Sequence, residues 1–158
     1  MPRVSLELRQ IPFLTERGVS VPAARLFVHA SFLSPQGRRV PYPTLIDTGA
    51  AYSVVPYRLA RQIGWSNLGA HLILANQSRP VAWLGVAAEM GELEVELVDA
   101  RFAVRSASLR VVAKVVSQPV SPHLDAFAVL GMSFFLDNQA LLEVDATGAT
   151  FSSSLWIP

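Results

Sequence analysis

The sequence of 158 residues contains no cysteine and few charged residues. Without cysteine, disulfide bonds, cysteine nucleophiles and thiolate metal sites are all excluded. Charged residues make up 16% of the chain and give a formal net charge of +1, so we expect neither a nucleic-acid partner nor an electrostatic membrane anchor. No apolar stretch is long enough to span a bilayer, and residues 1–10 lack the apolar centre of a signal peptide. These absences predict a soluble, cytoplasmic protein.

Several common types of functional site are also missing from the sequence. His29, His71 and His123 lie far apart and lack carboxylate or histidine partners at ligand spacing, so no metal and no cofactor are expected. The chain contains no Gly-x-Ser-x-Gly turn and no glycine-rich phosphate loop. A serine hydrolase and a nucleotide-binding protein are therefore poor interpretations.

The polar and apolar residues alternate along most of the chain. Fifty-one per cent of the residues are hydrophobic, which predicts a large core, and the length fits one domain over residues 1–158. A period of two is typical of strands with one buried face. Short spacing and Gly or Pro turns favour a β-barrel or sandwich over a parallel α/β sheet. The predicted strands are residues 4–9, 26–33, 72–75, 81–90, 93–104, 109–116, 140–144 and 150–157.

Helix is predicted at two places, and some conspicuous side chains have ordinary structural interpretations. One helix should span Pro56 to Ile63 with Gly64 as its C-terminal cap, and a second should span Met132 to Leu136. The three glutamates that alternate with apolar residues are interpreted as a solvated strand face, and the three tryptophans as core or interface residues. These residues are Glu92, Glu94 and Glu96, and Trp65, Trp83 and Trp156.

One short segment has a pattern that is typical of a catalytic carboxylate. Leu45 and Ile46 end an apolar strand, and Asp47-Thr48-Gly49 follows directly. Thr48 has a hydroxyl that can fix neighbouring backbone, and Gly49 permits a turn that a side chain would block. A carboxylate that a buried strand delivers into a tight loop is held rigidly, as a catalytic acid or base requires. The tripeptide alone is weak evidence, because a chain of this length contains one by chance on the order of a few per cent of the time. An aspartate that caps a β-turn is the alternative interpretation.

The residues around this motif resemble the retropepsin-like aspartic proteases. Residues 45–55 look like the family's catalytic loop and the strand after it, with Ser53 where the family usually has Ser or Thr. Residues 128–136 are similar to its second signature, in which two apolar residues and a glycine, here Gly131, precede a short helix. In the family that strand passes behind the catalytic loop. The resemblance covers about residues 20–145 and implies a mainly β fold: a single-lobe, closed β-barrel with one or two short helices.

Between the two signatures the family has a flap, a β-hairpin that closes over the substrate. Residues 72–85 are similar in position and shape, with an apolar strand, a polar tip over residues 76–79 and a return over residues 81–85. The tip lacks the glycines of retroviral members, and an ordinary exposed hairpin is the alternative. The resemblance implies that the residues in contact with substrate are Ala50, Asn76, Gln77 and Ser78.

The resemblance also implies two copies of the chain. Peptide hydrolysis in this family uses two carboxylates that share one proton around a water molecule. The chain has one Asp-Thr-Gly, and the similar segment at Asp145 contains an extra residue. A homodimer in which the two Asp47 side chains meet on a two-fold axis would supply the pair, with Asp47, Thr48 and Gly49 as catalytic residues. Residues 4–10 and 150–157 are candidate interface strands, unless they close the barrel.

Three functions remain open from the sequence. The first is an active homodimeric aspartic endopeptidase that hydrolyses extended, mainly apolar peptides. The second is a non-catalytic module of the same fold that dimerises or binds peptides. The third is a small-ligand β-barrel, for which the sequence offers no specific set of polar residues. The intact Asp47-Thr48-Gly49 favours the first, because a binding module does not need a carboxylate pair.

Overall fold

The computed structural model describes residues 2–14, 17–65, 71–72, 81–99, 102–145 and 152–157. Within these ranges the protein is mainly β with two short helices, which confirms the predicted fold class. Neither of these helices has the length and apolar character needed to cross a lipid bilayer. The elements are β1 (Arg3–Ser5), β2 (Glu7–Leu14), β3 (Ser20–Leu33), β4 (Arg39–Ile46), β5 (Ser53–Val55), α1 (Tyr57–Ile63), β6 (His71–Leu72), β7 (Ala82–Trp83), β8 (Val86–Val98), β9 (Leu109–Val116), β10 (Ala128–Leu130), α2 (Met132–Asp137), β11 (Leu141–Asp145) and β12 (Ser152–Trp156).

Six of the strands close into a barrel. The order around the ring is β3, β4, β10, β5, β9 and β8, and β8 returns to pair with β3. Alternation along β9 explains how the ring is filled, because Leu109, Val111, Ala113 and Val115 are all buried. The strands predicted from the period-two pattern therefore form the barrel wall, and their buried side chains fill its core.

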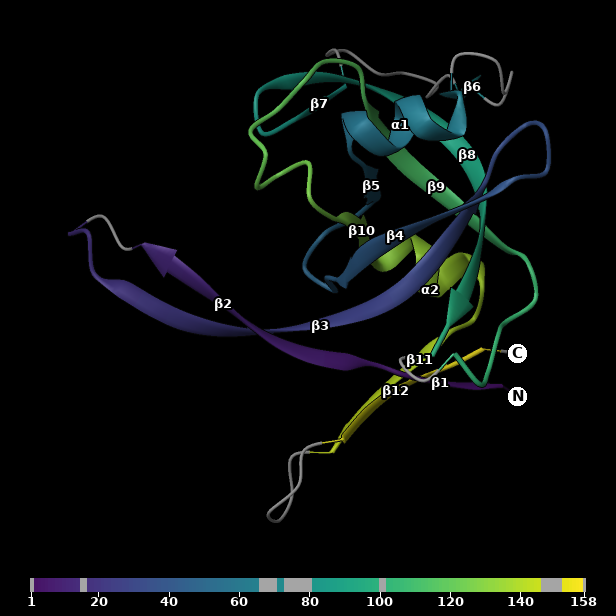
Figure 1. Cartoon of the computed structure of the whole chain (residues 1–158), viewed down its shortest axis with the longest axis horizontal. Coiled ribbons are helices and arrows are strands. Elements are labelled where there is room, and N and C mark those ends of the chain that lie inside the picture. Colours follow the sequence, from purple (N-terminus) through teal and green to yellow (C-terminus); the bar gives the residue numbers. More distant parts are fainter. Residues whose placement is uncertain are drawn as a thin grey trace.

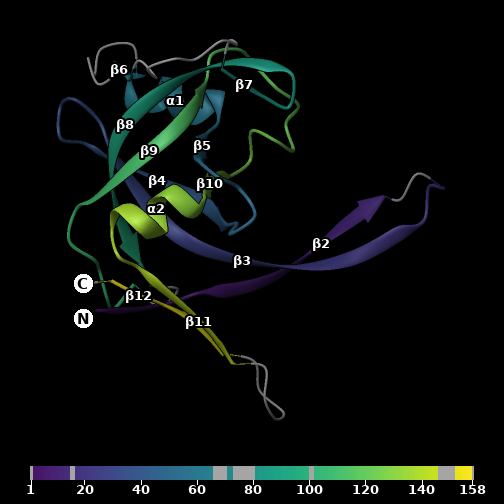
Figure 2. The ribbon, with the colours of Figure 1, turned by 180° about the vertical axis from the view of Figure 1, so that it is seen from behind.

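Two further features project from the barrel. The N-terminal half of β3 pairs with β2 and forms a long hairpin that extends away from the ring (Figures 1 and 2). Strands β1, β12 and β11 form a separate three-stranded sheet in that order, and the two chain ends lie close together beside it (Figure 1). Val4 and Leu155 of this sheet belong to the same buried cluster as the barrel residues. The terminal strands thus pack against the barrel core without joining its wall.

The helices agree with the prediction. Pro56 is the N-cap of α1, and Gly64 takes the left-handed conformation with φ +72° at its C-cap, where its N–H donates to the carbonyl of Arg61. Helix α2 begins at Met132, directly after Gly131. Both helices bury apolar residues against the barrel, so these short segments are fixed by packing more than by helix propensity.

The predicted boundary near Gly91 is wrong. The sequence indicated separate strands before and after this glycine, but β8 runs without interruption from Val86 to Val98. A side chain at position 91 would place its Cβ 1.9 Å from the indole ring of Trp65. Gly91 therefore makes room for a buried tryptophan and does not end a strand.

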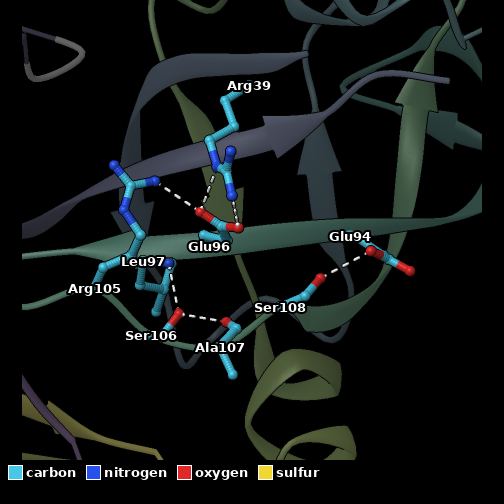
Figure 3. A network of polar contacts seen from close by, with 8 residues as sticks. All are labelled: Arg39, Glu94, Glu96, Leu97, Arg105, Ser106, Ala107 and Ser108. Atoms are coloured by element: carbon cyan, nitrogen blue, oxygen red, sulfur yellow. Dashed lines mark hydrogen bonds and ion pairs between the residues drawn. The ribbon is translucent and has the colours of Figure 1, made fainter. Parts of the chain in front are cut away.

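The prediction that Glu96 belongs to a solvated face is also wrong. Glu94 is exposed, but Glu96 on the same strand is only 7% exposed. Arg39 of β4 donates two hydrogen bonds of 2.8 Å to its carboxylate, and Arg105 donates a third of 2.7 Å (Figure 3). Since β3 lies between β4 and β8, this ion-paired carboxylate of β8 reaches across β3 to Arg39 of β4. The alternating pattern could not reveal it, because it does not show which side chains from other segments meet Glu96.

The Glu96 pair predicts a specific loss of stability in acid. The hydrogen bonds from Arg39, followed by those from Arg105, lower the pKa of Glu96 from 4.5 to about 2. A carboxyl group with a lowered folded-state pKa stabilises the protein fully above its unfolded pKa and loses that contribution as the pH falls toward the folded value. We therefore expect the free energy of unfolding of the wild type to fall between about pH 4.5 and pH 2. In Glu96→Gln this part of the pH dependence should be missing.

Denaturant titrations at several pH values measure this effect. Glu94→Gln is the matched control, since Glu94 is exposed and accepts one hydrogen bond from Ser108 (Figure 3). It should retain the wild-type slope. Equal slopes in the Glu96→Gln variant and the wild type would contradict the assignment of the acid-sensitive group.

Candidate active site

Asp47 is positioned by the end of a buried strand. Leu45 and Ile46 close β4 and are buried, and the chain then emerges at Asp47, which is exposed. The backbone N–H of Asp47 donates to the carbonyl of Leu130 at 3.0 Å, so β10 fixes the point at which the chain leaves the sheet. The buried strand and its neighbour thus deliver a carboxylate to the surface at a defined position.

The chain turns sharply at this point. The N–H of Ala50 donates to the carbonyl of Asp47 at 3.2 Å, and the N–H of Gly49 donates to Asp47 Oδ1 at 2.9 Å. This is the β-turn with an aspartate cap that the alternative interpretation predicted. The cap uses one carboxylate oxygen. Among the described residues Oδ2 has no hydrogen-bond partner, so the same turn orients the group and leaves an oxygen for chemistry.

Strand β10 lies between the two strands that the Asp47 turn connects. It runs parallel to β4, with Leu130 beside Ile46, and antiparallel to β5, with Val129 beside Val54. The two apolar residues and glycine of residues 128–131 therefore lie directly behind the loop, as the sequence resemblance implied. The turn is held on both sides by one short strand that comes from about 80 residues further along the chain.

At Gly131 the backbone after β10 comes closest to the backbone of the Asp47 loop. A Cβ at this position would lie 2.5 Å from the carbonyl oxygen of Tyr52 and 2.7 Å from that of Ala50. The N–H of Met132 donates to the Ala50 carbonyl at 2.7 Å, and the N–H of Gly131 donates to Ser53 Oγ at 3.2 Å. Ser53 is buried, so its hydroxyl is held in place to accept this bond. Backbone contact of this kind is possible only with glycine.

Gly49 has a different role from the one predicted. The sequence suggested that a side chain there would block the turn, but Gly49 does not lie in the left-handed region. The nearest atom to a Cβ at this position would be Asp47 Oδ1 at 3.2 Å, a side-chain atom that can move. A larger residue would press on the carboxylate and leave the backbone intact. The backbone constraint lies at Gly131 instead.

Thr48 is exposed, and its hydroxyl makes no hydrogen bond with any part of the chain that the structure describes. The expectation that it fixes neighbouring backbone is therefore not met within these residues. Its backbone lies between Asp47 and Gly49 in the turn, so its side chain is presented beside the carboxylate.

A cavity of about 330 Å³ lies in front of the carboxylate. It is bordered by the strand that leads into the turn, by β3 and by β11, and Asp47 is the one carboxylate among its lining residues. The lining residues are Ala24, Arg25, Leu26, Ile46, Asp47, Thr48 and Leu142. The described part of this chain thus places a single acid in the cavity.

Four of these lining residues, Ala24, Arg25, Leu26 and Leu142, were not named as site residues by the sequence analysis. Arg25 brings a cation to the cavity from the point where β3 meets the end of β4, and Leu142 comes from β11. Neither belongs to a recognisable motif. Their proximity to Asp47 follows from the pairing of β3 with β4 and from the path of the chain after α2, which no local signal encodes.

The comparisons with known proteins leave the family open. No family model matches this sequence, and no curated protein matches it. Among solved structures, a retropepsin-like aspartic protease from Rickettsia conorii is similar in its crystal structure, with 14% sequence identity and a TM-score of 0.43. The similarity covers 99% of this chain and 97% of that chain. Values this low do not assign the protein to a family.

Only part of the predicted substrate-contacting set can be placed. Ala50 is half-buried and packs against a second apolar cluster on the side of the barrel under β7 and β8, together with Trp83. Asn76, Gln77 and Ser78 lie outside the described residues. No group of three or more His, Asp or Glu residues suited to a metal ion occurs among the residues that the structure describes.

The predicted strand from Val81 to Met90 is wrong. The chain reverses within it, at Leu84 and Gly85 between β7 and β8. Both residues have positive φ, +48° and +78°, the pattern of a two-residue hairpin turn. The sequence did not predict this turn, because the residue before the glycine is leucine and the usual residue at that position is Asn or Asp.

The contact of Gly131 with the loop backbone predicts a severe effect of substitution. Gly131→Ala should lower the free energy of unfolding by about 3 kcal/mol, because the new methyl group meets two backbone carbonyls that cannot move independently. Chemical denaturation monitored by tryptophan fluorescence measures this loss.

Gly49→Ala is the matched control for Gly131→Ala. Its methyl group would meet only the movable carboxylate of Asp47, so it should change stability by less than about 1 kcal/mol. Equal losses in the two variants would show that the packing behind the loop is not the main constraint.

Proposed function

We propose that this protein is an aspartic endopeptidase whose catalytic pair consists of Asp47 and the same residue of a second copy. The observation that carries the proposal is the placement of Asp47. It is exposed at the edge of a cavity, it is oriented by the N–H of Gly49, and it is anchored through Leu130 of β10.

The chemistry needs two carboxylates with different protonation states. One ionised carboxylate takes a proton from a water molecule as the water oxygen attacks the peptide carbonyl carbon. The other, protonated, donates its proton to the carbonyl oxygen. A proton then passes to the amide nitrogen, the carbon–nitrogen bond breaks, and an acid and an amine leave. Two carboxylates about 3 Å apart share a proton naturally, because both cannot ionise cheaply.

The proposed mechanism takes its second acid from a second copy, because the described residues place one acid in the cavity. Asp47 is the one carboxylate among the described lining residues, and Asp47 and Thr48 are both exposed. A two-fold axis beside the turn would bring two identical carboxylates together without any further motif. The homodimer is therefore part of the proposed mechanism.

The substrate that we propose is an extended peptide or protein segment of mainly apolar character. The cluster that contains Ala50 also contains half-buried Trp83 and Phe127, so apolar surface adjoins the loop that carries Asp47. We propose that the β7–β8 hairpin covers the bound peptide. No metal or cofactor takes part in this mechanism. The cytoplasmic location expected from the sequence stays a prediction.

Asp47→Asn tests the proposal directly. It should reduce cleavage of a peptide library by at least about a thousandfold, because the amide can neither accept the proton from water nor share one with its twin. Fluorogenic or mass-spectrometric digestion measures the loss. Asp137→Asn is the control, since Asp137 is an exposed aspartate at the end of α2 that does not line the cavity, and it should retain activity.

Two outcomes would count against the proposed function. Cleavage that survives Asp47→Asn would exclude the carboxylate pair. A wild-type protein that binds peptides in an Asp47-independent way without cleaving them would favour the non-catalytic binding module.

A further inference from the structure

Helix α1 begins without a cap of its own. Its N-cap residue is Pro56, which has no side-chain oxygen and makes no capping bond. The first N–H groups of a helix have no partner within the helix, so they need an acceptor from elsewhere. Asp125 supplies one, because its Oδ1 accepts a hydrogen bond of 2.9 Å from the N–H of Arg58. Asp125 lies 67 residues further along the chain, in the segment between β9 and β10.

Asp125 is bound to a second element through its backbone. The hydroxyl of Tyr42, on β4, donates to the carbonyl of Asp125. Tyr42 is only 8% exposed. Burial and the nearby Asp125 carboxylate raise the pKa of the Tyr42 phenol, so the hydroxyl keeps the proton that it donates. Together, the contacts of Asp125 with Arg58 and Tyr42 tie one residue to both α1 and β4, and they form the Asp125 clasp.

The clasp holds a segment that has few other attachments. Residues 117–127 connect β9 to β10 and contain neither helix nor strand (Figures 1 and 2). Pro119 and Pro122 lack an N–H and cannot contribute to a ladder of backbone hydrogen bonds. Apart from the clasp, the segment makes one hydrogen bond to another described part of the chain, from the N–H of Ser117 to the carbonyl of Ala87 at 3.0 Å. Loss of the clasp would therefore release most of this segment.

The segment carries two apolar side chains to the surface proposed for the substrate. Val120 and Phe127 are half-buried and pack against the apolar cluster that also includes Ala50 and Trp83. Phe127 meets the buried ring of Phe27 edge-on, with 5.8 Å between the ring centroids. The position of this part of the apolar surface therefore depends on how firmly residues 117–127 are held.

The clasp is separate from the anchor of the Asp47 turn. Strand β10 pairs with β4 from Ala128 to Leu130, and the N–H of Asp47 donates to the carbonyl of Leu130. These bonds begin after the segment ends and involve no atom of Asp125. Release of the segment should therefore weaken peptide binding and leave the carboxylate in place.

We propose that Asp125 is a positioning residue for substrate binding. It acts through residues 117–127, which it fixes so that Val120 and Phe127 present a formed apolar surface to the peptide. A segment that is ordered before the peptide arrives loses less conformational entropy on binding, so the clasp raises the affinity. This inference rests on the proposed function, since the peptide is the substrate proposed there.

Steady-state kinetics tests the role of Asp125, with the best-cleaved member of a fluorogenic octapeptide pool whose four central positions vary over Ala, Val, Leu and Phe. Asp125→Ala removes the acceptor oxygen and should raise KM at least about tenfold, while kcat stays within about twofold of the wild type. Asp125→Asn keeps an oxygen that can accept from Arg58, so its KM should stay within about threefold. Asp137→Ala is the matched control, since Asp137 is an exposed aspartate outside the segment, and it should leave KM unchanged.

Peptide binding measures the same effect without cleavage. In the Asp47→Asn background, fluorescence anisotropy with a fluorescein-labelled version of the same pool gives Kd. Adding Asp125→Ala should raise Kd at least about tenfold, and adding Asp137→Ala should not change it. Tyr42→Phe removes the other contact of the clasp and should raise Kd at least about threefold. Near-ultraviolet circular dichroism should show that the variants keep the wild-type tertiary structure, and if Asp125→Ala does not fold, Tyr42→Phe carries the test.

The outcomes separate this inference from the proposed function. An unchanged KM and Kd in folded Asp125→Ala, or a fall in kcat with KM unchanged, would overturn the role of Asp125. If Asp47-dependent cleavage accompanies either result, the protease survives and the clasp is wrong. Peptide binding that depends on Asp125 without any cleavage by the wild type would support the clasp and remove the protease. The absence of both binding and cleavage of the pool would contradict the two proposals together.

Discussion

The insertion of β10 between β4 and β5 is the constraint on which the candidate site depends. Its hydrogen bond to the Asp47 backbone and the contact of Gly131 with two loop carbonyls fix the turn from behind. Strand β10 also completes the barrel ring, so the same strand both positions the carboxylate and closes the barrel. A substitution that displaces β10 should therefore affect both.

The Asp47 turn reconciles two interpretations that seemed to exclude each other. The carboxylate caps its own turn through Gly49, as an ordinary structural aspartate does, and it also lies exposed at a cavity. The cap occupies one oxygen and restricts the side-chain rotation, which is useful for catalysis because orientation is then established before substrate arrives. Turn capping is therefore compatible with the catalytic role that we propose for this acid.

The barrel and the three-stranded sheet differ in how many of their strand edges are paired. The barrel ring is closed by the pairing of β8 with β3, and the Glu96 carboxylate of β8 is hydrogen-bonded to Arg39 of β4 across β3. Among the described residues, β11 and the projecting half of β3 each have an open edge, as β1 and β2 do, and Leu142 of β11 and Arg25 of β3 line the Asp47 cavity.

The sequence by itself determined the elements whose signals are local. The period-two pattern predicted β9 to the residue, and Gly64 marked the end of α1. That the two glycine-containing segments would meet at the loop was implied by the family resemblance and not by a local signal. Other features depended on contacts between distant residues. Gly91 continues a strand because Trp65 needs the space, Glu96 is buried because Arg39 and Arg105 reach it, and Arg25 and Leu142 join the cavity through strand pairing. Only the tertiary structure brings such residues together. A local pattern indicates which face of a strand a side chain occupies, but it does not identify the residues from other segments that contact that side chain.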